Sequence, residues 1–446
     1  MSSLAHDAQE FANRETVEGI QRYKLALLGE RLAAHQNWVD HFASVGMRAQ
    51  DLGSPGALRD APTLEKADLR SRYPYPFLTV PVGRTERFCA TSGTTGLPVL
   101  FGFTKQDFDV TLVRQLSRIF RTVGITPGDL AYQGYGYGLW IGGPSMDVAM
   151  KAFGVVNLPV GPGRGELMVS WLKDLGPTVT TMSPLWLMTL INLAHGSGIN
   201  PKRDWKLRVG LFGGQSVSAT FRNELEAQMP DGFRAHNIYG TTEAGGPVLG
   251  ISCRYSHAAD EMHLINDDSV LSEIVDPGTL APAKPGDVGE IVITTLDKEA
   301  SPVVRWRTRD LVRVSERPFV CPCGRSGYPL VGRIIGRSDD MLKVRGVIVY
   351  PTQIEDVIAG VEGTVKEAWQ IFIDRKTSVL DAIEVAIERK SNSNRSVSEI
   401  VNQVSASLNA RLGLTCPVLC HEEGSLPRYE AKATRVLIRD SACSIT

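Results

Sequence analysis

The sequence has few cysteines, no long apolar segment and almost no excess charge of either sign. Seven cysteines among 446 residues are an odd, sparse set, which argues against a disulfide-stapled secreted fold and favours a reducing cytoplasm. The N-terminus becomes charged early and has no apolar stretch typical of a secretory leader. The most apolar segment, residues 177–194, is broken by Pro184 and several threonines, so it is too polar to span a membrane. Ser183 and Pro184 instead predict the cap and first residue of a helix.

The small net charge also narrows the class of protein. Lysine plus arginine total 48 and aspartate plus glutamate total 49, so the formal net charge is −1. This balance argues against a dedicated binder of nucleic acid or of membrane surfaces. Internal repeats and low-complexity tracts are absent from the sequence. Hydrophobic residues make up 43% and charged residues 22%, a composition that can bury a sizeable core and excludes a disordered protein.

The order of apolar patterns predicts an α/β fold with two domains. Residues 5–50 are expected to be helical, and the Pro-rich connector that follows contains Thr63, which could cap a short helix. Between about 83 and 250, strand-like runs that end in glycine alternate with helical stretches, as in layered α/β folds. We therefore predict a large N-terminal α/β domain over residues 1–339, with a β-rich subdomain at about 251–335. A small α+β domain with the order β-α-β-β-α-β is expected over residues 340–446, with Ser396 or Ser398 at the cap of its second helix.

The segment TSGTTGLP, residues 91–98, is the strongest candidate for a phosphate-binding loop. It follows a strand-like run and combines two glycines with hydroxyl side chains: Thr91, Ser92, Gly93, Thr94, Thr95 and Gly96. Such a loop can turn tightly and present backbone N–H groups and hydroxyls to an anion. It is not a Walker A loop, because GxxxxGK[ST] is absent. The alternative interpretation is a polar surface loop.

Two pairs of soft ligands predict a structural zinc site. Cys253 and His257 have Cys-x3-His spacing, and Cys321 and Cys323 have Cys-x-Cys spacing. Thiolates and imidazole suit tetrahedral Zn²⁺, and a closed set of four implies a structural ion. His263 is the rival for the fourth position. The alternative is four unrelated residues.

Aromatic residues on a glycine-rich segment predict a site for a flat ring. YGYGLWIGG contains Tyr135, Tyr137, Gly138 and Trp140. Aromatic side chains on such a loop can sandwich an aromatic ligand. The alternative is an aromatic cluster in the core.

Taken together, the motifs give the chain a family resemblance. It resembles the adenylate-forming superfamily of acyl-CoA synthetases, peptide-synthetase adenylation domains and luciferases, and more closely the phenylacetate–CoA ligases. The motifs occur in the family's order between residues 91 and 432 and cover most of the chain: TSGTTGLP, YGYGLWIGG, FGGQS, YGTTEAGG, RTRDL, CPCGRSG, GRSDDMLKVRG and LPRYEAKATRV.

The resemblance implies an ATP site. By it, Glu243 is linked to Mg²⁺, Thr242 contacts the α-phosphate and Tyr239 lines the adenine site. Asp310 is implied to clamp the ribose, because a carboxylate can accept both hydroxyl hydrogens. The implied ATP-binding set is Thr91, Ser92, Gly93, Thr94, Thr95, Gly96, Gly213, Gly214, Tyr239, Gly240, Thr241, Thr242, Asp310 and Arg337. Without the motif context, Glu243 would be a solvated turn acid and Arg337 a surface salt-bridge partner.

The resemblance also implies a mobile C-terminal domain that carries a catalytic lysine. Lys432 corresponds to the lysine that assists adenylation, by neutralising charge on the α-phosphoryl group in the transition state. Asp339 corresponds to the hinge, and Gly346 to the position where the CoA pantetheine passes close to backbone. The acyl group is implied to lie by Tyr135, Tyr137, Gly138, Trp140 and Gly214.

Two departures from the family pattern limit these implications. Leu97 and Val99 flank Pro98, so the loop lysine of many relatives is absent. After Gly143 the chain reads PSMDVAMKAFG and diverges from phenylacetate ligases, which leaves benzoates and anthranilates open as substrates beside phenylacetate.

We therefore expect an AMP-forming ligase that joins a carboxylic acid, of the aromatic class, to CoA by way of an acyl-adenylate. Its cofactors would be ATP with Mg²⁺ and a structural Zn²⁺. The alternatives are transfer of the acyl group to a carrier protein or another small nucleophile, and a non-catalytic nucleotide-binding regulator. No nucleic acid or membrane partner is expected, and a homodimer is left open.

Overall fold

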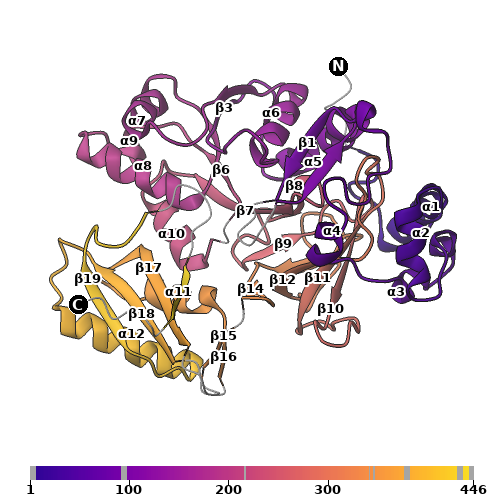
Figure 1. The fold of residues 1–446 in the computed structure, drawn as a ribbon. Helices are drawn as coiled ribbons and strands as arrows, with labels where there is room; N and C mark the ends of the chain where they lie inside the picture. The colour runs from indigo at the N-terminus through magenta and orange to yellow at the C-terminus, as the bar shows by residue number, and fades with distance from the viewer. Residues whose placement is uncertain are drawn as a thin grey trace.

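The computed structural model describes residues 7–91, 98–214, 217–340, 342–344, 347–375, 382–428 and 435–440. They form a large N-terminal domain and a smaller C-terminal domain, as predicted. In Figure 1 the C-terminal domain lies below the α/β layers of the large domain, and the N-terminal helices lie at the far end.

An eight-stranded mixed sheet forms the centre of the large domain. Its first five strands along one side are parallel, and the last three are antiparallel. In spatial order the strands are β4 (Val156–Pro159), β3 (Leu130–Gln133), β5 (Val179–Met182), β6 (Val209–Phe212), β7 (Arg234–Thr241), β8 (Gly246–Ile251), β9 (Glu261–His263) and β13 (Leu330–Gly332). The α/β alternation predicted between residues 83 and 250 is confirmed.

Helices cover this sheet on both faces. Adjacent residues of β6, Leu211 and Phe212, belong to two different buried clusters, because successive side chains of a strand point to opposite faces. The helix α5 (Val113–Thr122) precedes the first parallel strand. The helices between the parallel strands are α6 (Gly142–Phe153), α7 (Gly165–Asp174), α8 (Pro184–Gly196), α9 (Pro201–Asp204) and α10 (Ala219–Ala227). The predicted start of α8 is confirmed: the Ser183 hydroxyl accepts the Trp186 N–H, and Pro184 is the first residue.

The predicted β-rich region is a separate four-stranded antiparallel sheet together with β9 and β13. Its strands, in spatial order, are β10 (Val270–Val275), β11 (Val288–Thr295), β12 (Trp306–Arg313) and β14 (Gly336–Arg337). A short hairpin of β1 (Arg87–Ala90) and β2 (Leu100–Phe103) precedes them in the chain and is followed by the π-helical stretch η3 (Gln106–Leu112).

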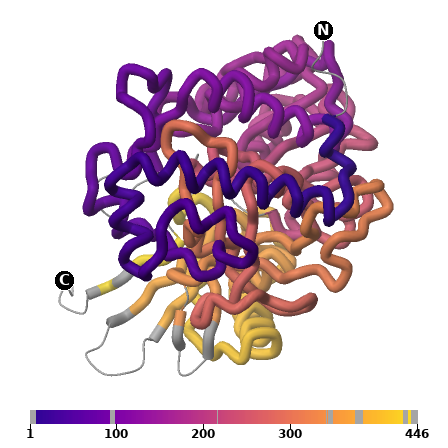
Figure 2. Tube along the Cα trace, turned by 90° about the vertical axis from the view of Figure 1, so that its right-hand side faces the viewer, coloured from indigo at the N-terminus to yellow at the C-terminus, as the bar shows by residue number. Residues whose placement is uncertain are grey.

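The N-terminal helices pack onto this β-rich region. They comprise α1 (Arg14–Ala33), α2 (Gln36–Ala43), the 3₁₀ turns η1 (Ala49–Gly53) and η2 (Val82–Arg84), and two short helices, α3 (Ala57–Asp60) and α4 (Lys66–Arg70). Figure 2 shows α1 running across this side of the molecule, where Arg14 pairs with Asp267 at 2.8 Å and Lys24 with Asp297 at 2.7 Å. The prediction that Thr63 caps a helix is wrong: α4 is capped by Glu65, in a reciprocal capping box with Asp68.

The C-terminal domain has its own four-stranded sheet and its own buried core. The strand order is β19 (Val418–Glu422), β18 (Ala382–Arg389), β17 (Thr364–Arg375) and β20 (Val436–Asp440), with α11 (Pro351–Ala359) and α12 (Val397–Leu412) packed on it. Ser396 caps α12, as predicted. The first predicted strand is instead a hairpin of β15 (Leu342–Val344) and β16 (Val347–Val349), and the final strand β20 was not predicted.

Within the described ranges, no helix is both long enough and apolar enough to cross a membrane.

Candidate active site

Tyr239, Asp310 and Arg337, which come from three separate motifs, meet at one point. The Tyr239 hydroxyl at the end of β7 donates to Asp310 Oδ2 at 2.8 Å, and Arg337 Nη1 donates to Asp310 Oδ1 at 3.2 Å. Asp310 and Arg337 are cross-strand partners in the register of β12 and β14. The far side of the Arg337 guanidinium donates to both oxygens of Asp339, at 2.8 and 2.9 Å. One arginine therefore links the predicted ribose carboxylate to the predicted hinge residue.

In this cluster, burial and the neighbouring charges together shift the pKa values of Tyr239 and Arg337. The Asp310 side chain is 13% exposed, and burial followed by the Asp310 charge raises the pKa of Tyr239 well above its ordinary value. The phenol therefore stays protonated and keeps donating. Burial opposes the charge of Arg337, but its hydrogen bonds to Asp339 and the charge of Asp310 raise its pKa overall. The site thus holds a largely buried carboxylate between a phenol donor and a guanidinium, an arrangement that suits a ribose clamp.

The turn after β7 presents Thr242 and Glu243. Both residues are buried, at 8% and 7% exposure. At Gly240 a side chain is excluded, because a Cβ would lie 1.9 Å from the Gly246 carbonyl oxygen. This close approach folds the chain back on itself directly before Glu243. Hydroxyl and carboxylate oxygens are hard donors that suit Mg²⁺, so the donor set of this turn fits the predicted ion.

The predicted adenine and acyl motifs lie at the carboxyl ends of neighbouring parallel strands. Tyr135 follows β3, Gly213 and Gly214 follow β6, and Tyr239 lies in β7. The Tyr135 hydroxyl donates to the Leu211 carbonyl at 3.1 Å and would lie 3.1 Å from a Cβ at Gly213. Ligands of open α/β sheets bind at this edge, so the arrangement fits a nucleotide and an acyl group side by side.

The aromatic loop is split between core and surface. Tyr135 is buried, and Trp140 meets it edge-on with ring centroids 5.2 Å apart. The Trp140 ring also covers Gly142, where a Cβ would lie 2.3 Å from ring atoms. Tyr137 is 40% exposed, and burial together with the Asp147 charge raises its pKa to about 12. Trp140 and Tyr137 are therefore the members that still have accessible surface, whereas Tyr135 is part of the support.

Several predicted site residues lie outside the described part of the chain: Ser92, Gly93, Thr94, Thr95, Gly96, Gly346 and Lys432. The residues that flank the phosphate loop are described. The Thr91 N–H donates to the Val99 carbonyl at 3.1 Å and the Ala90 N–H to Leu139 at 2.8 Å. The loop therefore begins and ends on a closed hairpin, next to the start of the aromatic loop.

Cys253, His263, Cys321 and Cys323 form a second cluster, away from these motifs. Their candidate ligand atoms all lie within 4.8 Å of one another. The sulfurs of Cys253 and Cys321 are 3.6 Å apart, and Cys323 Sγ is 3.4 Å from His263 Nε2. A tetrahedral Zn²⁺ with Zn–S of about 2.3 Å would separate two sulfurs by about 3.8 Å. The four donors and their spacing fit that ion.

His257, predicted as the fourth ligand, is not part of this cluster. Its Nε2 lies 2.9 Å from Glu226 Oε1 on α10, and the ring is not among the four grouped donors. The rival, His263, is carried by β9, and its Nδ1 has no hydrogen-bond partner among the described residues. Chain spacing favoured His257, but the pairing of β9 with β13 brings His263 to the two cysteines.

Sequence reasoning missed one buried lysine beside the Glu243 turn. Lys298 is 5% exposed, and its Nζ donates to the Glu243 carbonyl at 3.1 Å. Burial lowers its pKa to about 8, against the opposing charges of Asp107 and Glu243. In the sequence, Lys298 sits in the polar segment LDKEAS between two strands, a context typical of an exposed turn. No local signal marks it as buried.

Known proteins are similar to this chain over most of its length. The AMP-binding enzyme family model matches residues 88–296, and that of the AMP-binding enzyme C-terminal domain matches residues 346–439. A phenylacetate–coenzyme A ligase of Pseudomonas putida is 32% identical over 430 residues, 94% of each chain. The enzyme of the same name from Escherichia coli K12 is 32% identical and covers 89% of this chain and 88% of its own. A structure of 2-hydroxyisobutyryl-CoA ligase with its acyl-AMP has a TM-score of 0.86 at 23% identity, over 95% of this chain and 90% of that one.

The fold and the site thus define an AMP-binding enzyme of the adenylate-forming class. Within that class, the chain belongs to the phenylacetate–coenzyme A ligase family.

Proposed function

We propose that this protein is an AMP-forming ligase that activates an aromatic carboxylic acid and transfers it to CoA. The carboxylate oxygen attacks the α-phosphorus of ATP, and pyrophosphate leaves. The thiol sulfur of CoA then attacks the acyl carbon, its proton is lost, and AMP leaves. The observation that carries the proposal is the Tyr239–Asp310–Arg337–Asp339 cluster, because it joins a ribose acceptor to the residue that corresponds to the family's hinge.

In this proposal each half of the molecule has its own role. Residues 1–339 bind ATP and the acid, and residues 340–446 move about Asp339. Ion pairs between the two parts support a defined arrangement: Lys366 pairs with Glu224 at 2.7 Å, and Arg333 pairs with Asp356. Both pairings join surfaces that must separate when the domain rotates. Glu243 and Thr242 would hold Mg²⁺ on the phosphates, where the ion would offset phosphate charge.

A screen of aryl carboxylates by pyrophosphate release, run with and without CoA, tests the function. We expect release with at least one aromatic acid and a thioester only when CoA is present. If pyrophosphate forms but CoA gives no thioester, the acceptor is a carrier protein or another nucleophile. An absence of release with every acid would contradict the activity itself.

We also propose that Cys253, His263, Cys321 and Cys323 hold a structural Zn²⁺. Three of them are buried, at 2%, 1% and 6% exposure for Cys253, His263 and Cys321. The ligands come from the segment before β9, from β9 itself and from the segment before β13, so the ion would tie the two ends of the β-rich region together.

Purified protein is therefore expected to contain about one zinc per chain, and Cys321→Ser should lose most of it. Because ligand thiolates couple metal binding to folding, the melting temperature should fall by several degrees as well. Elemental analysis and thermal denaturation measure the two effects. Cys416→Ser, at a half-buried cysteine outside the cluster, is the control and should change neither. Metal-free protein of unchanged stability would refute the site.

The proposed aromatic substrate rests on the accessible ring faces beside the carboxyl edge of the sheet. Trp140 is half-buried and stands on Gly142, with its edge toward Tyr135. A flat acid packed on such a face gains its buried area and about 0.5–1.5 kcal/mol for ring geometry.

Trp140→Ala should therefore raise KM for an aryl acid about tenfold or more, since 1.4 kcal/mol is a factor of about ten. ATP binding should change little, and short aliphatic acids should be affected less. The measurement is kcat/KM for one aryl and one aliphatic acid. Trp171→Ala, on the exposed side of α7, controls for loss of a tryptophan elsewhere. Equal losses for both acids would mean that Trp140 only packs the core.

A further inference from the structure

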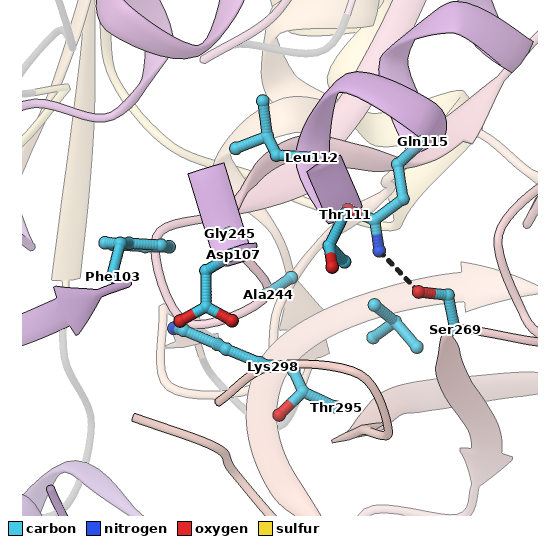
Figure 3. A pocket seen from close by; sticks show the side chains of 11 residues that line it. Phe103, Asp107, Thr111, Leu112, Gln115, Ala244, Gly245, Ser269, Thr295 and Lys298 are labelled. Carbon is cyan, nitrogen blue, oxygen red and sulfur yellow. Dashed lines mark hydrogen bonds between the residues drawn. The ribbon is translucent and has the colours of Figure 1, made fainter. Parts of the chain in front are cut away.

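Lys298 is a buried cation with an unusual environment. It lies in the connection between β11 and β12, and among the described residues its ammonium contacts a carbonyl oxygen and two aromatic rings rather than a carboxylate. The contacts are the Glu243 carbonyl at 3.1 Å and the faces of Phe101 and Phe103, at 4.8 and 4.4 Å from the ring centroids. Figure 3 shows its side chain extending below Asp107 and the Ala244 turn.

These contacts connect the two segments that handle the phosphates in the proposed reaction. Phe101 and Phe103 belong to β2, the strand that directly follows the phosphate loop, and Glu243 belongs to the turn proposed to hold Mg²⁺. A single ammonium therefore lies between the hairpin that carries the loop and the turn that carries the carboxylate.

The backbone around Lys298 is held by other groups. Asp107 accepts the N–H groups of Glu299 and Ala300, at 2.6 and 3.0 Å, and that of Thr104 at 3.0 Å. The Ser301 hydroxyl accepts the Gly102 N–H at 2.9 Å. The connection thus stays fixed to β2 without the Lys298 charge.

Burying the ammonium does not serve stability. A buried charge costs several kcal/mol in desolvation, and replacing it with an apolar side chain of similar volume is often neutral or stabilising. What the charge adds is local: a charge-assisted hydrogen bond on the Glu243 carbonyl and a fixed positive potential beside the phosphates. The loop itself offers no lysine, since Leu97 and Val99 flank Pro98.

We propose that Lys298 is a positioning residue for adenylation, which orients the Glu243 turn against the phosphate-loop hairpin through the Glu243 carbonyl. The proposal rests on the proposed role of Glu243. It predicts that the charge matters for the first half-reaction, in which Glu243 acts on the triphosphate, and not for the second, in which the pyrophosphate has left.

Lys298→Met tests this, because methionine keeps the length and apolar volume of the side chain and removes the donor. We expect acyl-AMP formation to fall about tenfold to a hundredfold, the effect of losing one hydrogen bond from a charged group. Thioester formation from supplied acyl-AMP should stay within about twofold of wild type, and the melting temperature should be unchanged or higher. Calorimetric titration with Mg-ATP, without the acid, should show weakened binding.

Lys24→Met is the matched control. Lys24 pairs with Asp297, the neighbour of Lys298, but it has no part in the proposed reaction. The variant should lower the melting temperature and leave the rates of both half-reactions at the wild-type level. Parallel loss of both half-reactions and of stability in Lys298→Met would overturn the proposal. Should the methionine variant not fold, Lys298→Arg takes its place: it keeps the charge but alters the donor geometry, and only the adenylation step should fall.

Glu243→Gln separates this inference from the function on which it rests. If Lys298 acts through the Glu243 turn, the double variant should lose less than the product of the two single losses. Independent, multiplicative losses would overturn the positioning role and leave that of Glu243 intact. If Glu243→Gln alone leaves adenylation unchanged, the role of Glu243 falls and that of Lys298 with it.

Discussion

Replacing Lys432 with alanine is expected to reduce acyl-AMP formation by roughly 10²–10³-fold or more, the scale of losing one preorganised electrostatic contact in a transition state. Attack by a carboxylate on the α-phosphorus brings an anion onto a polyanion, so charge builds up on the α-phosphoryl group in this step. A lysine ammonium can neutralise that charge. Thioester formation has no such requirement, so supplied acyl-AMP and CoA should react at a near-normal rate.

The residues on both sides of Lys432 support this expectation, although Lys432 itself lies outside the described residues. Arg428 pairs with Glu388 at 2.6 Å. Arg435 lies over the Trp369 ring at 4.7 Å and donates to the Trp369 and Glu367 carbonyls, both at 3.0 Å. The described residues on each side of the lysine are therefore both anchored to the C-terminal sheet. A movement of the C-terminal domain would carry the lysine into and out of the site.

The measurement is pyrophosphate release for the first step and thioester formation from synthetic acyl-AMP for the second. Arg439→Ala is the charge-matched control, since Arg439 is exposed on β20 and pairs with Glu384 at 2.9 Å. It should affect neither step. A Lys432→Ala enzyme that retains adenylation, or one that loses both steps together, would rule out this role.

The fold could be predicted where the signal is local. Ser183 before Pro184, and Ser396 three residues before Glu399, mark helix starts by side-chain capping, and both are confirmed. Thr63 carried the same type of signal, but Glu65 and Asp68 form a capping box nearer to the helix. The strand β20 was missed because it joins the sheet by parallel pairing with β17, far away in the sequence. Such pairing leaves little trace in a single segment.

In the candidate site, too, the residues with a local motif could be predicted, and those placed by long-range packing could not. Motif order indicated Tyr239, Asp310 and Arg337, and the register of β12 with β14 brings the last two face to face. Spacing favoured His257 over His263, but the choice depends on the pairing of β9 with β13, which brings His263 to the cysteines. Lys298 gave no signal at all, since its burial results from the packing of β2 against a distant connection. Motifs therefore identify the main residues of the site. Long-range packing decides which further residues join them.

Asp310→Ala is expected to weaken ATP binding about a hundredfold or more, with little change in the choice of acid. Its two oxygens already receive Tyr239 and Arg337, so the carboxylate is held in place before the nucleotide binds. Each hydrogen bond to a charged group contributes about 1.5–3 kcal/mol, and a ribose offers two hydroxyls. Removal also leaves the Arg337 charge without one of its partners. Calorimetric titration with ATP measures the loss directly.

A matched carboxylate in the same antiparallel sheet separates nucleotide binding from stability. The Glu273 side chain on β10 is 16% exposed and pairs at 3.2 Å with Arg305, which is buried, so Glu273→Ala also removes the carboxylate partner of a buried arginine. It should lower the melting temperature while ATP affinity stays near wild type. If both variants lose affinity equally, the effect of Asp310 is structural.

A comparison of ATP with 2′-deoxy-ATP and 3′-deoxy-ATP locates the effect on the ribose. The wild-type enzyme should bind at least one deoxy analogue about tenfold or more weakly, since it loses a hydrogen bond to a carboxylate. Asp310→Ala should bind all three nucleotides alike, because the acceptor that tells them apart is gone. The coupling between the missing hydroxyl and the missing carboxylate then measures the contact as a double-mutant cycle does. If Asp310→Ala still discriminates as the wild type does, the hydroxyls bind elsewhere, and Asp310 serves only to hold Arg337 and Tyr239.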